Sequence, residues 1–157
     1  MGFLLERDGL NGKSGKAFAT IDGRNVELFG LKKFEANAEF DKADFPVCGT
    51  KTVQQKITKM KISGSFTIYY GTPEFIKIAH DYQTKGTLPE ITLQVTNSDS
   101  ASSVGTQTVA YYGVNLDKIP LSLLDDSADA LEEEVSFTAA SFEPLDNFNP
   151  PAVLGGN

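Results

Sequence analysis

Few residues of this chain are of types that could carry out covalent or metal chemistry. Its 157 residues include one cysteine, Cys48, and one histidine, His80. A cysteine thiolate activated by a histidine base is a familiar nucleophile, but nothing in the spacing pairs these two residues. A solitary histidine in a predicted helix is more often structural than catalytic, and one thiol is too few for a Cys/His zinc cluster. The sequence therefore predicts a protein that is not an enzyme and that uses no metal or cofactor.

Two short motifs resemble ligand-binding loops, and both depart from the required pattern. Gly12-Lys13-Ser14 matches the end of a phosphate-binding loop, but Arg7 stands where the first glycine is needed. Three residues have the spacing of the first ligands of a calcium loop: Asp125, Ser127 and Asp129. Ala130 replaces the turn glycine of such a loop, and Ser136 replaces its bidentate glutamate. Neither motif predicts a site.

The charge balance limits the possible partners. The formal net charge is -7, and 40% of the residues are hydrophobic. A protein that grips nucleic acid needs a basic surface to neutralise phosphates, so we expect no tight binding to DNA. An acidic wall would still let DNA pass without sticking to it. No stretch approaches the length of a membrane span and the N-terminus does not resemble a signal peptide, so we expect synthesis in the cytoplasm.

The most regular stretch is a strand followed by a helix, between Ile57 and Gly86. Alternate residues are mostly apolar, as in a half-buried strand: Met60, Ile62, Gly64, Phe66, Ile68 and Tyr70. The opposite face carries the small polar residues Ser63, Ser65 and Thr67. A helix is predicted over about residues 73–85, with Thr72 as N-cap, Pro73 in the first position and Gly86 as the stop.

The rest of the chain is predicted to be mainly β. Asp22-Gly23 is a strong hairpin signal. Strands are predicted over 16–21, 26–31, 34–40, 91–96, 107–119 and 130–142, with Phe34, Ala36, Ala38 and Phe40 facing inward. We interpret 41–56 as a long loop, 1–15 as an N-terminal arm and 144–157 as an extended C-terminal tail. With no linker in between, residues 1–157 are expected to form one domain.

The small polar strand faces allow two interpretations. Ser63, Ser65 and Thr67, like Thr92, Gln94 and Thr96, could be the solvent side of an antiparallel sandwich. They could also line a channel, whose wall must be wet without being sticky. Periodicity is the same in both cases.

Five stretches together resemble one protein family. They are GKSGKAFATIDG (Gly12–Gly23), GSFTIYYGTPEF (Gly64–Phe75), LQVTNSDSASSVGTQTV (Leu93–Val109), LDDSADALEEEVSFT (Leu124–Thr138) and LDNF (Leu145–Phe148). In this order they resemble the tail tube proteins of contractile phage tails, in the group of PBSX-type prophages and phage-tail-like bacteriocins. The resemblance implies an antiparallel β-sandwich or distorted barrel with one flanking helix.

The resemblance also implies an assembly. Six copies would form a ring with one continuous barrel around a lumen, and rings would stack into a tube inside a contractile sheath. The loop would stack the rings through Asp44, Phe45, Val47, Lys51 and Gln54, and Ser63, Ser65 and Thr67 would face the lumen. The two terminal arms would dock between subunits. The implied partners are further copies, the sheath, baseplate and tail-terminator proteins, and DNA passing through the lumen of a virion or tail-like particle.

Two alternatives remain at this level. The ring-forming tube protein of the type VI secretion system shares the fold. A monomeric β-barrel could instead bind a small apolar ligand, with the 11 phenylalanines lining its pocket and the helix closing its mouth. The sequence also leaves open whether a tube would carry DNA or be empty, and which sheet face would line it.

Overall fold

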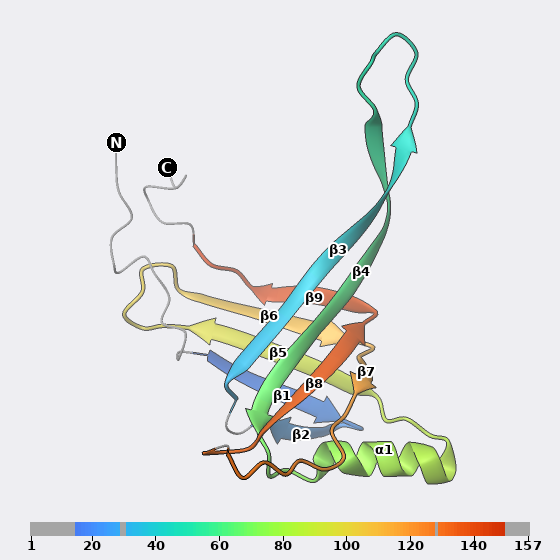
Figure 1. The fold of residues 1–157 in the computed structure, drawn as a ribbon. Helices are drawn as coiled ribbons and strands as arrows, with labels where there is room; N and C mark the ends of the chain where they lie inside the picture. Colours follow the sequence, from blue (N-terminus) through green and yellow to red (C-terminus); the bar gives the residue numbers. More distant parts are fainter. Residues whose placement is uncertain (1–14, 29–30, 128, 150–157) are drawn as a thin grey trace.

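The described part of the chain folds into two β-sheets with one helix. A computed structural model describes residues 15–28, 31–127 and 129–149 (Figure 1). Within them the elements are β1 (Gly15–Ile21), β2 (Arg24–Glu27), β3 (Lys33–Phe45), β4 (Gln54–Tyr69), α1 (Glu74–Lys85), β5 (Ile91–Ser98), β6 (Thr106–Tyr112), β7 (Asn115–Lys118), β8 (Glu132–Ala139) and β9 (Ser141–Asp146). Residues 1–14 of the predicted N-terminal arm (1–15) and residues 150–157 of the predicted C-terminal tail lie outside the described residues.

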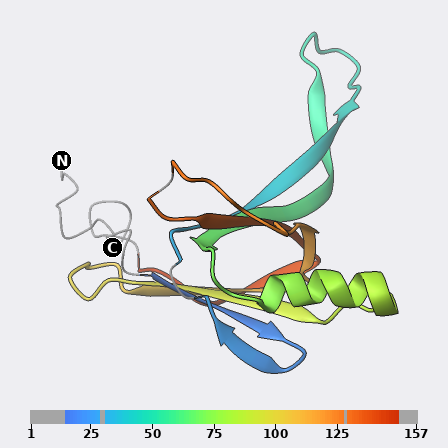
Figure 2. The same cartoon turned by 60° about the horizontal axis from the view of Figure 1, so that its bottom comes forward.

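The strands form two antiparallel layers. One sheet has the order β2-β1-β5-β6-β9 and the other the order β3-β4-β8-β7. The layers face each other, and α1 lies alongside them (Figure 2). The predicted sandwich with one flanking helix is confirmed. These two sheets do not close into a barrel, so the barrel-shaped ligand pocket of the monomeric alternative is wrong.

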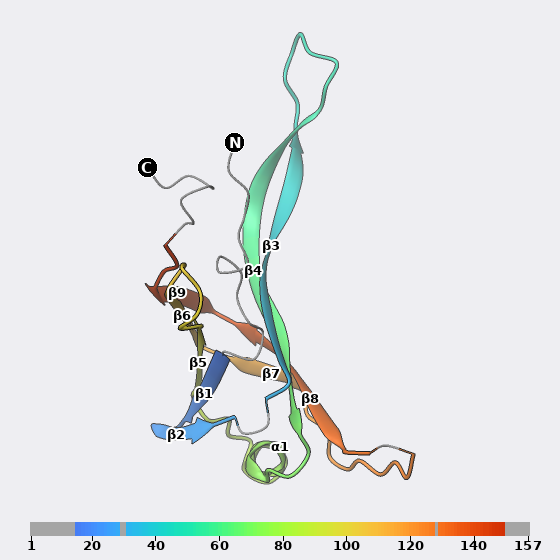
Figure 3. The same ribbon diagram turned by 90° about the vertical axis from the view of Figure 1, so that its left-hand side faces the viewer.

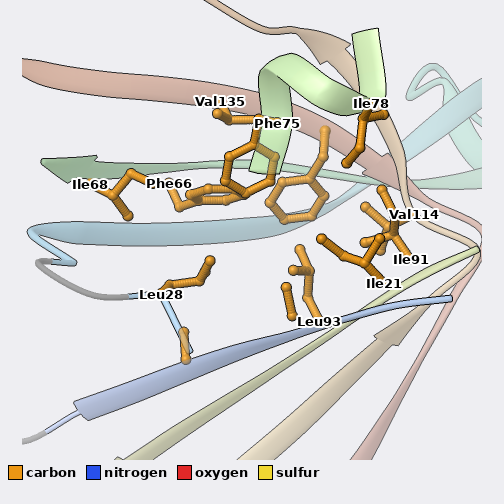
Figure 4. Close-up of a cluster of buried hydrophobic side chains, with 13 residues drawn as sticks. Ile21, Leu28, Phe66, Ile68, Phe75, Ile78, Ile91, Leu93, Val114 and Val135 are labelled. Carbon is orange, nitrogen blue, oxygen red and sulfur yellow. The ribbon is translucent and has the colours of Figure 1, made fainter. Parts of the chain in front are cut away.

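Aromatic rings fill the space between the sheets. Phe66, Phe75 and Phe137 are each at most 2% exposed. Their ring centroids lie 5.5 Å (Phe66–Phe75) and 6.2 Å (Phe66–Phe137) apart, and Phe34 stacks on Phe66 at 6.2 Å. Figure 4 shows aliphatic side chains from β1, β5 and α1 closing around these rings. Several phenylalanines therefore make the core rather than line a cavity.

The hairpin between β1 and β2 forms as its sequence predicts. Asp22 and Gly23 have φ values of 50° and 81°, the left-handed conformations that tight hairpin turns require. Ala17, Ala19 and Ile21 are buried on one face of β1. β2 ends at Glu27, so the strand predicted over 26–31 is displaced toward the N-terminus.

The helix is confirmed with one change at its start. Pro73 is the N-cap rather than the first helical residue, and the Thr72 hydroxyl accepts a weak bond of 3.4 Å from the Glu74 N–H. Gly86 ends the helix at φ 69°, where its N–H donates to the Tyr82 carbonyl at 2.9 Å. Phe75 and Ile78 are buried. Among the described residues no helix is long and apolar enough to span a membrane.

Two stretches that are each predicted as one continuous strand are divided into two strands, at the corner of the sandwich where the chain crosses between the sheets. The stretch 107–119 divides at Gly113, and 130–142 divides at Ala140, so each passes from one sheet to the other. Gly113 has φ 62°, and a Cβ placed on it would lie 2.7 Å from the Ala140 Cβ. The Ala140 N–H donates to the Tyr112 carbonyl at 3.0 Å. Two chain segments therefore turn against each other, and only a small residue fits between them.

The predicted loop over 41–56 is wrong for half of its length. β3 and β4 stay paired from Lys33↔Thr67 to Phe45↔Gln54, which leaves 46–53 as the loop. The register shifts between Asp41 and Lys42, where the Thr58 hydroxyl donates to the Asp41 carbonyl at 3.1 Å. This bulge interrupts the alternation, so the period-2 sequence pattern ends there although the strand continues.

The predicted tail also starts too early, because β9 extends to Asp146. Its Pro144 is tolerated since β9 is an edge strand and the ladder is irregular beside Val109.

Candidate assembly surfaces

The β3–β4 hairpin extends beyond the rest of the sandwich (Figures 1 and 3). β8 pairs with β4 only from Ile62 to Tyr69. Residues 39–61 therefore form a two-stranded projection, called the arm below. The eight β4 residues 54–61 span roughly 25 Å at the usual rise of a strand. Isolated two-stranded ribbons are marginal in water, so the arm is expected to gain stability from a partner.

Large apolar side chains are uncovered along the arm. About half of each side chain is exposed for Phe40, Phe45, Ile57 and Met60. The prediction that Ala38, Phe40 and Met60 face an intramolecular core is wrong, because the opposite sheet does not reach them. Alternation identified the apolar face of the strand correctly. It carried no signal about whether another layer covers that face.

The five residues predicted to stack rings lie together in the outer half of the arm. Asp44, Phe45 and Gln54 end the two strands, whereas Val47 and Lys51 belong to the loop 46–53. All five are exposed. The Gln55 amide donates to the Asp44 carboxylate at 3.4 Å, which fixes that carboxylate along the ribbon.

The residues predicted to face a lumen lie on the outer side of the four-stranded sheet. Ser63, Ser65 and Thr67 point away from the core residues Ile62, Phe66 and Ile68 and are half-buried. Their neighbours across the strands are also polar: Asn37, Glu35 and Lys33 on β3, and Thr138, Ser136 and Glu134 on β8. This face is therefore polar across three strands.

The outer side of the five-stranded sheet differs. It holds the predicted polar row of Thr92, Gln94 and Thr96, and the Thr96 and Thr108 hydroxyls lie 3.2 Å apart. Phe18 and Tyr112, which face the same way, are each more than a third exposed. The outer face of the four-stranded sheet also exposes an aromatic ring, because Tyr69 follows Ser65 and Thr67 on that face and is 47% exposed. Its run of small hydroxyl residues, rather than an absence of aromatic rings, sets it apart from the five-stranded sheet.

One buried carboxyl was not anticipated as a special group. Glu133 is 2% exposed, and its Oε2 finds no hydrogen-bond partner among the described residues. Burial raises the pKa of this carboxyl above its ordinary value. Glu133 lies on the same face of β8 as the core residues Val135 and Phe137.

The residues with nucleophilic or ligand potential are not brought together. Cys48 is exposed in the loop at the end of the arm, whereas His80 is exposed on α1 at the other end of the molecule (Figure 1). Asp125 accepts bonds from the Ser127 N–H at 3.0 Å and its hydroxyl at 2.6 Å, which lowers the Asp125 pKa. Its carboxylate therefore serves a local turn.

Comparisons with known proteins agree with this architecture. The model of a family described as phage tail tube protein matches residues 3–146. The phage-like element PBSX protein XkdM of Bacillus subtilis strain 168 is 36% identical over 140 residues, which cover 89% of this chain and 92% of that relative.

Solved structures share the fold. A chain of the anti-feeding prophage baseplate has a TM-score of 0.63 at 6% identity, covering 87% of this chain and 95% of its own. The SPP1 tail tube has a TM-score of 0.62 at 13% identity, covering 92% and 83%. The resemblance to PBSX-type tail tube proteins is confirmed. The chain belongs to the phage tail tube protein family.

Proposed function

We propose that this chain is the repeating subunit of a hollow tail tube, assembled as hexameric rings that stack inside a contractile sheath. The observation that carries the proposal is the arm. It projects roughly 25 Å from the sandwich and exposes Phe40, Phe45, Ile57 and Met60. Uncovered apolar surface of this kind is typical of a protein–protein contact, and family membership supports contacts between copies of the subunit.

The sheet edges support ring formation. β3 and β7 are the outer strands of the four-stranded sheet, and neither has a second neighbour among the described strands. Exposed edges invite pairing with another chain. Copies joined edge to edge would close a barrel around a lumen, and closure would leave no edge free.

The lumen wall would be the outer face of the four-stranded sheet. Ser63, Ser65 and Thr67 would present hydroxyls to the lumen, beside charged residues that include Glu35 and Glu134. The same wall carries Lys33 paired with Glu35, so its charges are of both signs and form no basic patch that would grip phosphates. The tube would let DNA pass without specific binding, or would puncture a cell envelope as an empty tube.

The further partners would be the sheath, baseplate and tail-terminator proteins. Structural relatives support this part of the proposal, because they come from an anti-feeding prophage baseplate and from a sheath/tube terminator of an extracellular contractile injection system. The protein would therefore reside in a virion or tail-like particle.

Electron microscopy of the purified, concentrated full-length chain tests the proposal. We expect sixfold rings and stacks of rings with an open centre. A protein that stays monomeric at every concentration tried would overturn the proposed function.

A further inference from the structure

An apolar groove lies between α1 and β7, at the end of the sandwich away from the arm (Figures 1 and 3). Its volume is about 500 Å³, and its lining includes Ile78, Tyr82, Leu88, Val114, Ile119 and Leu121. Tyr82, Leu88 and Leu121 are each more than half exposed. The described part of the chain therefore leaves this groove uncovered.

The groove and the arm are both apolar, and one is a recess whereas the other is a projection. The outer arm, which we define as residues 42–56, exposes the apolar side chains of Phe45, Val47 and Val53. The arm projects from one end of the molecule and α1, which contributes to the groove, lies at the other, as Figures 1 and 3 both show. A contact between a projection and a recess at opposite ends is heterologous, so it propagates from copy to copy instead of closing a dimer.

Charge distinguishes the outer arm from one segment beside the groove, whose own lining carries one acidic and one basic residue, Asp117 and Lys118. Within an acidic chain, residues 42–56 contain the lysines Lys42, Lys51 and Lys56 but only one acidic residue, Asp44. The segment 120–131, which contributes Leu121 to the groove, carries Asp125, Asp126 and Asp129 and no lysine or arginine. Opposite charges of this kind orient two apolar surfaces and speed their encounter.

We propose that the outer arm of one copy docks in the α1–β7 groove of a second copy, with its lysines toward segment 120–131. The inference rests on the proposed function and deepens it, because it names the surface that receives the arm. It assigns α1 and β7 a role in the contact between copies in addition to their role in the core.

The natural cysteine provides a direct test. Cys48 lies at the end of the arm, is exposed and is the only thiol of the chain. Leu88→Cys adds a second thiol at the rim of the groove. Assembled tubes of this variant are treated with a short bismaleimide and separated on a denaturing gel. Each subunit then has one thiol on its arm and one beside its groove. The cross-linker can therefore join the arm of one subunit to the groove of the next, and we expect a ladder of covalent multimers.

Two controls define the result. Cys48→Ser in the Leu88→Cys background should abolish the ladder, and Glu143→Cys, on the exposed edge strand β9, should not produce one. Tubes that are visible by microscopy but give no more ladder with Leu88→Cys than with Glu143→Cys would overturn this inference and leave the proposed function intact. Failure of the unmodified chain to form rings or tubes would overturn the proposed function and this inference together.

A charge exchange tests the orientation. Lys51→Glu with Lys56→Glu, and Asp126→Lys with Asp129→Lys, should each reduce stacking at least tenfold in a sedimentation assay. All four residues are exposed, so circular dichroism should show an unchanged fold. Combining both pairs should restore stacking. A combined variant that folds but stacks no better than either pair would contradict the proposed facing of the two segments.

Discussion

At the scale of single residues, the most unusual group is the carboxyl of Glu133. It sits on the core side of β8, and one of its oxygens is buried with no hydrogen-bond partner in the part of the chain that the structure describes. A buried carboxylate is costly unless it is paired, so burial raises its pKa. A group whose pKa is raised by folding favours the folded state below its unfolded pKa. It loses that contribution as the pH rises through the folded pKa.

Replacing this carboxyl should therefore stabilise the protein at neutral pH. We expect Glu133→Gln to raise the free energy of unfolding at pH 7 by on the order of 1 kcal/mol, since the amide removes a buried charge. The gain should shrink as the pH falls from 7 to 4.5, the ordinary pKa of the group, because the raised pKa makes the folded carboxyl take up its proton above pH 4.5. Urea unfolding at the two pH values measures this. Glu134→Gln, on the exposed face of the same strand, should change little; an equal effect of both variants would contradict the assignment.

At the scale of elements, one hairpin serves two environments. The base of β4 packs Phe66 into the core, where three other phenylalanine rings surround it. The arm carries Phe40 in the same alternation but at 52% exposure. The difference is set by whether the five-stranded sheet reaches the position.

Truncating Phe66 and Phe40 in turn should have different effects on stability, because Phe66 lies in the core and Phe40 lies on the arm. Phe66→Ala should lower the free energy of unfolding by roughly 3–5 kcal/mol, the usual cost for a fully buried phenylalanine. Phe40→Ala should leave the stability of the unassembled subunit within about 0.5 kcal/mol, as for an exposed site. Chemical denaturation of the dilute protein compares them. Full stability of Phe66→Ala would mean that the faces of β4 are reversed.

Shortening the arm should impair stacking without unfolding the subunit. Asp41 and Lys59 are paired residues, so an Asn-Gly turn can replace residues 42–58 between them. We expect a folded protein that forms rings but few tubes, because the removed residues contribute to the arm and not to the core. Microscopy counts the tubes, and circular dichroism checks the fold. Normal tube lengths in this variant would show that the outer arm does not stack the rings.

At the scale of the whole molecule, the two outer sheet faces should differ in access once the tube has formed. In a Cys48→Ser background, Ser65→Cys would place a thiol on the proposed lumen wall, and Gln94→Cys would place one on the five-stranded sheet. In assembled tubes both should react with a small maleimide. Only Gln94→Cys should react with a maleimide on a large polymer. Equal labelling of both by the polymer would contradict the proposed lumen face, and unassembled subunits serve as the control.

The sequence by itself determined the local elements and their faces. Period-2 alternation identified the buried side of the base of β4, where Ile62, Phe66 and Ile68 lie in the core. Asp22-Gly23 and Gly86 located a turn and a helix end, because each requires a left-handed backbone. Ordered stretches of sequence identified the family. Each of these local features is determined by residues that are close together in the sequence, so a single chain segment is enough to predict it.

Only the tertiary structure decided where strands change sheets and where a face is covered. Gly113 and Ala140 break two predicted strands because their segments meet at one corner, a contact between residues far apart in the chain. The bulge after Asp41 disguised a long hairpin as a loop. Phe40 and Met60 are exposed because the opposing sheet ends before it reaches them. Alternation states which way a side chain points, whereas the extent of the facing layer determines whether it becomes core or contact surface.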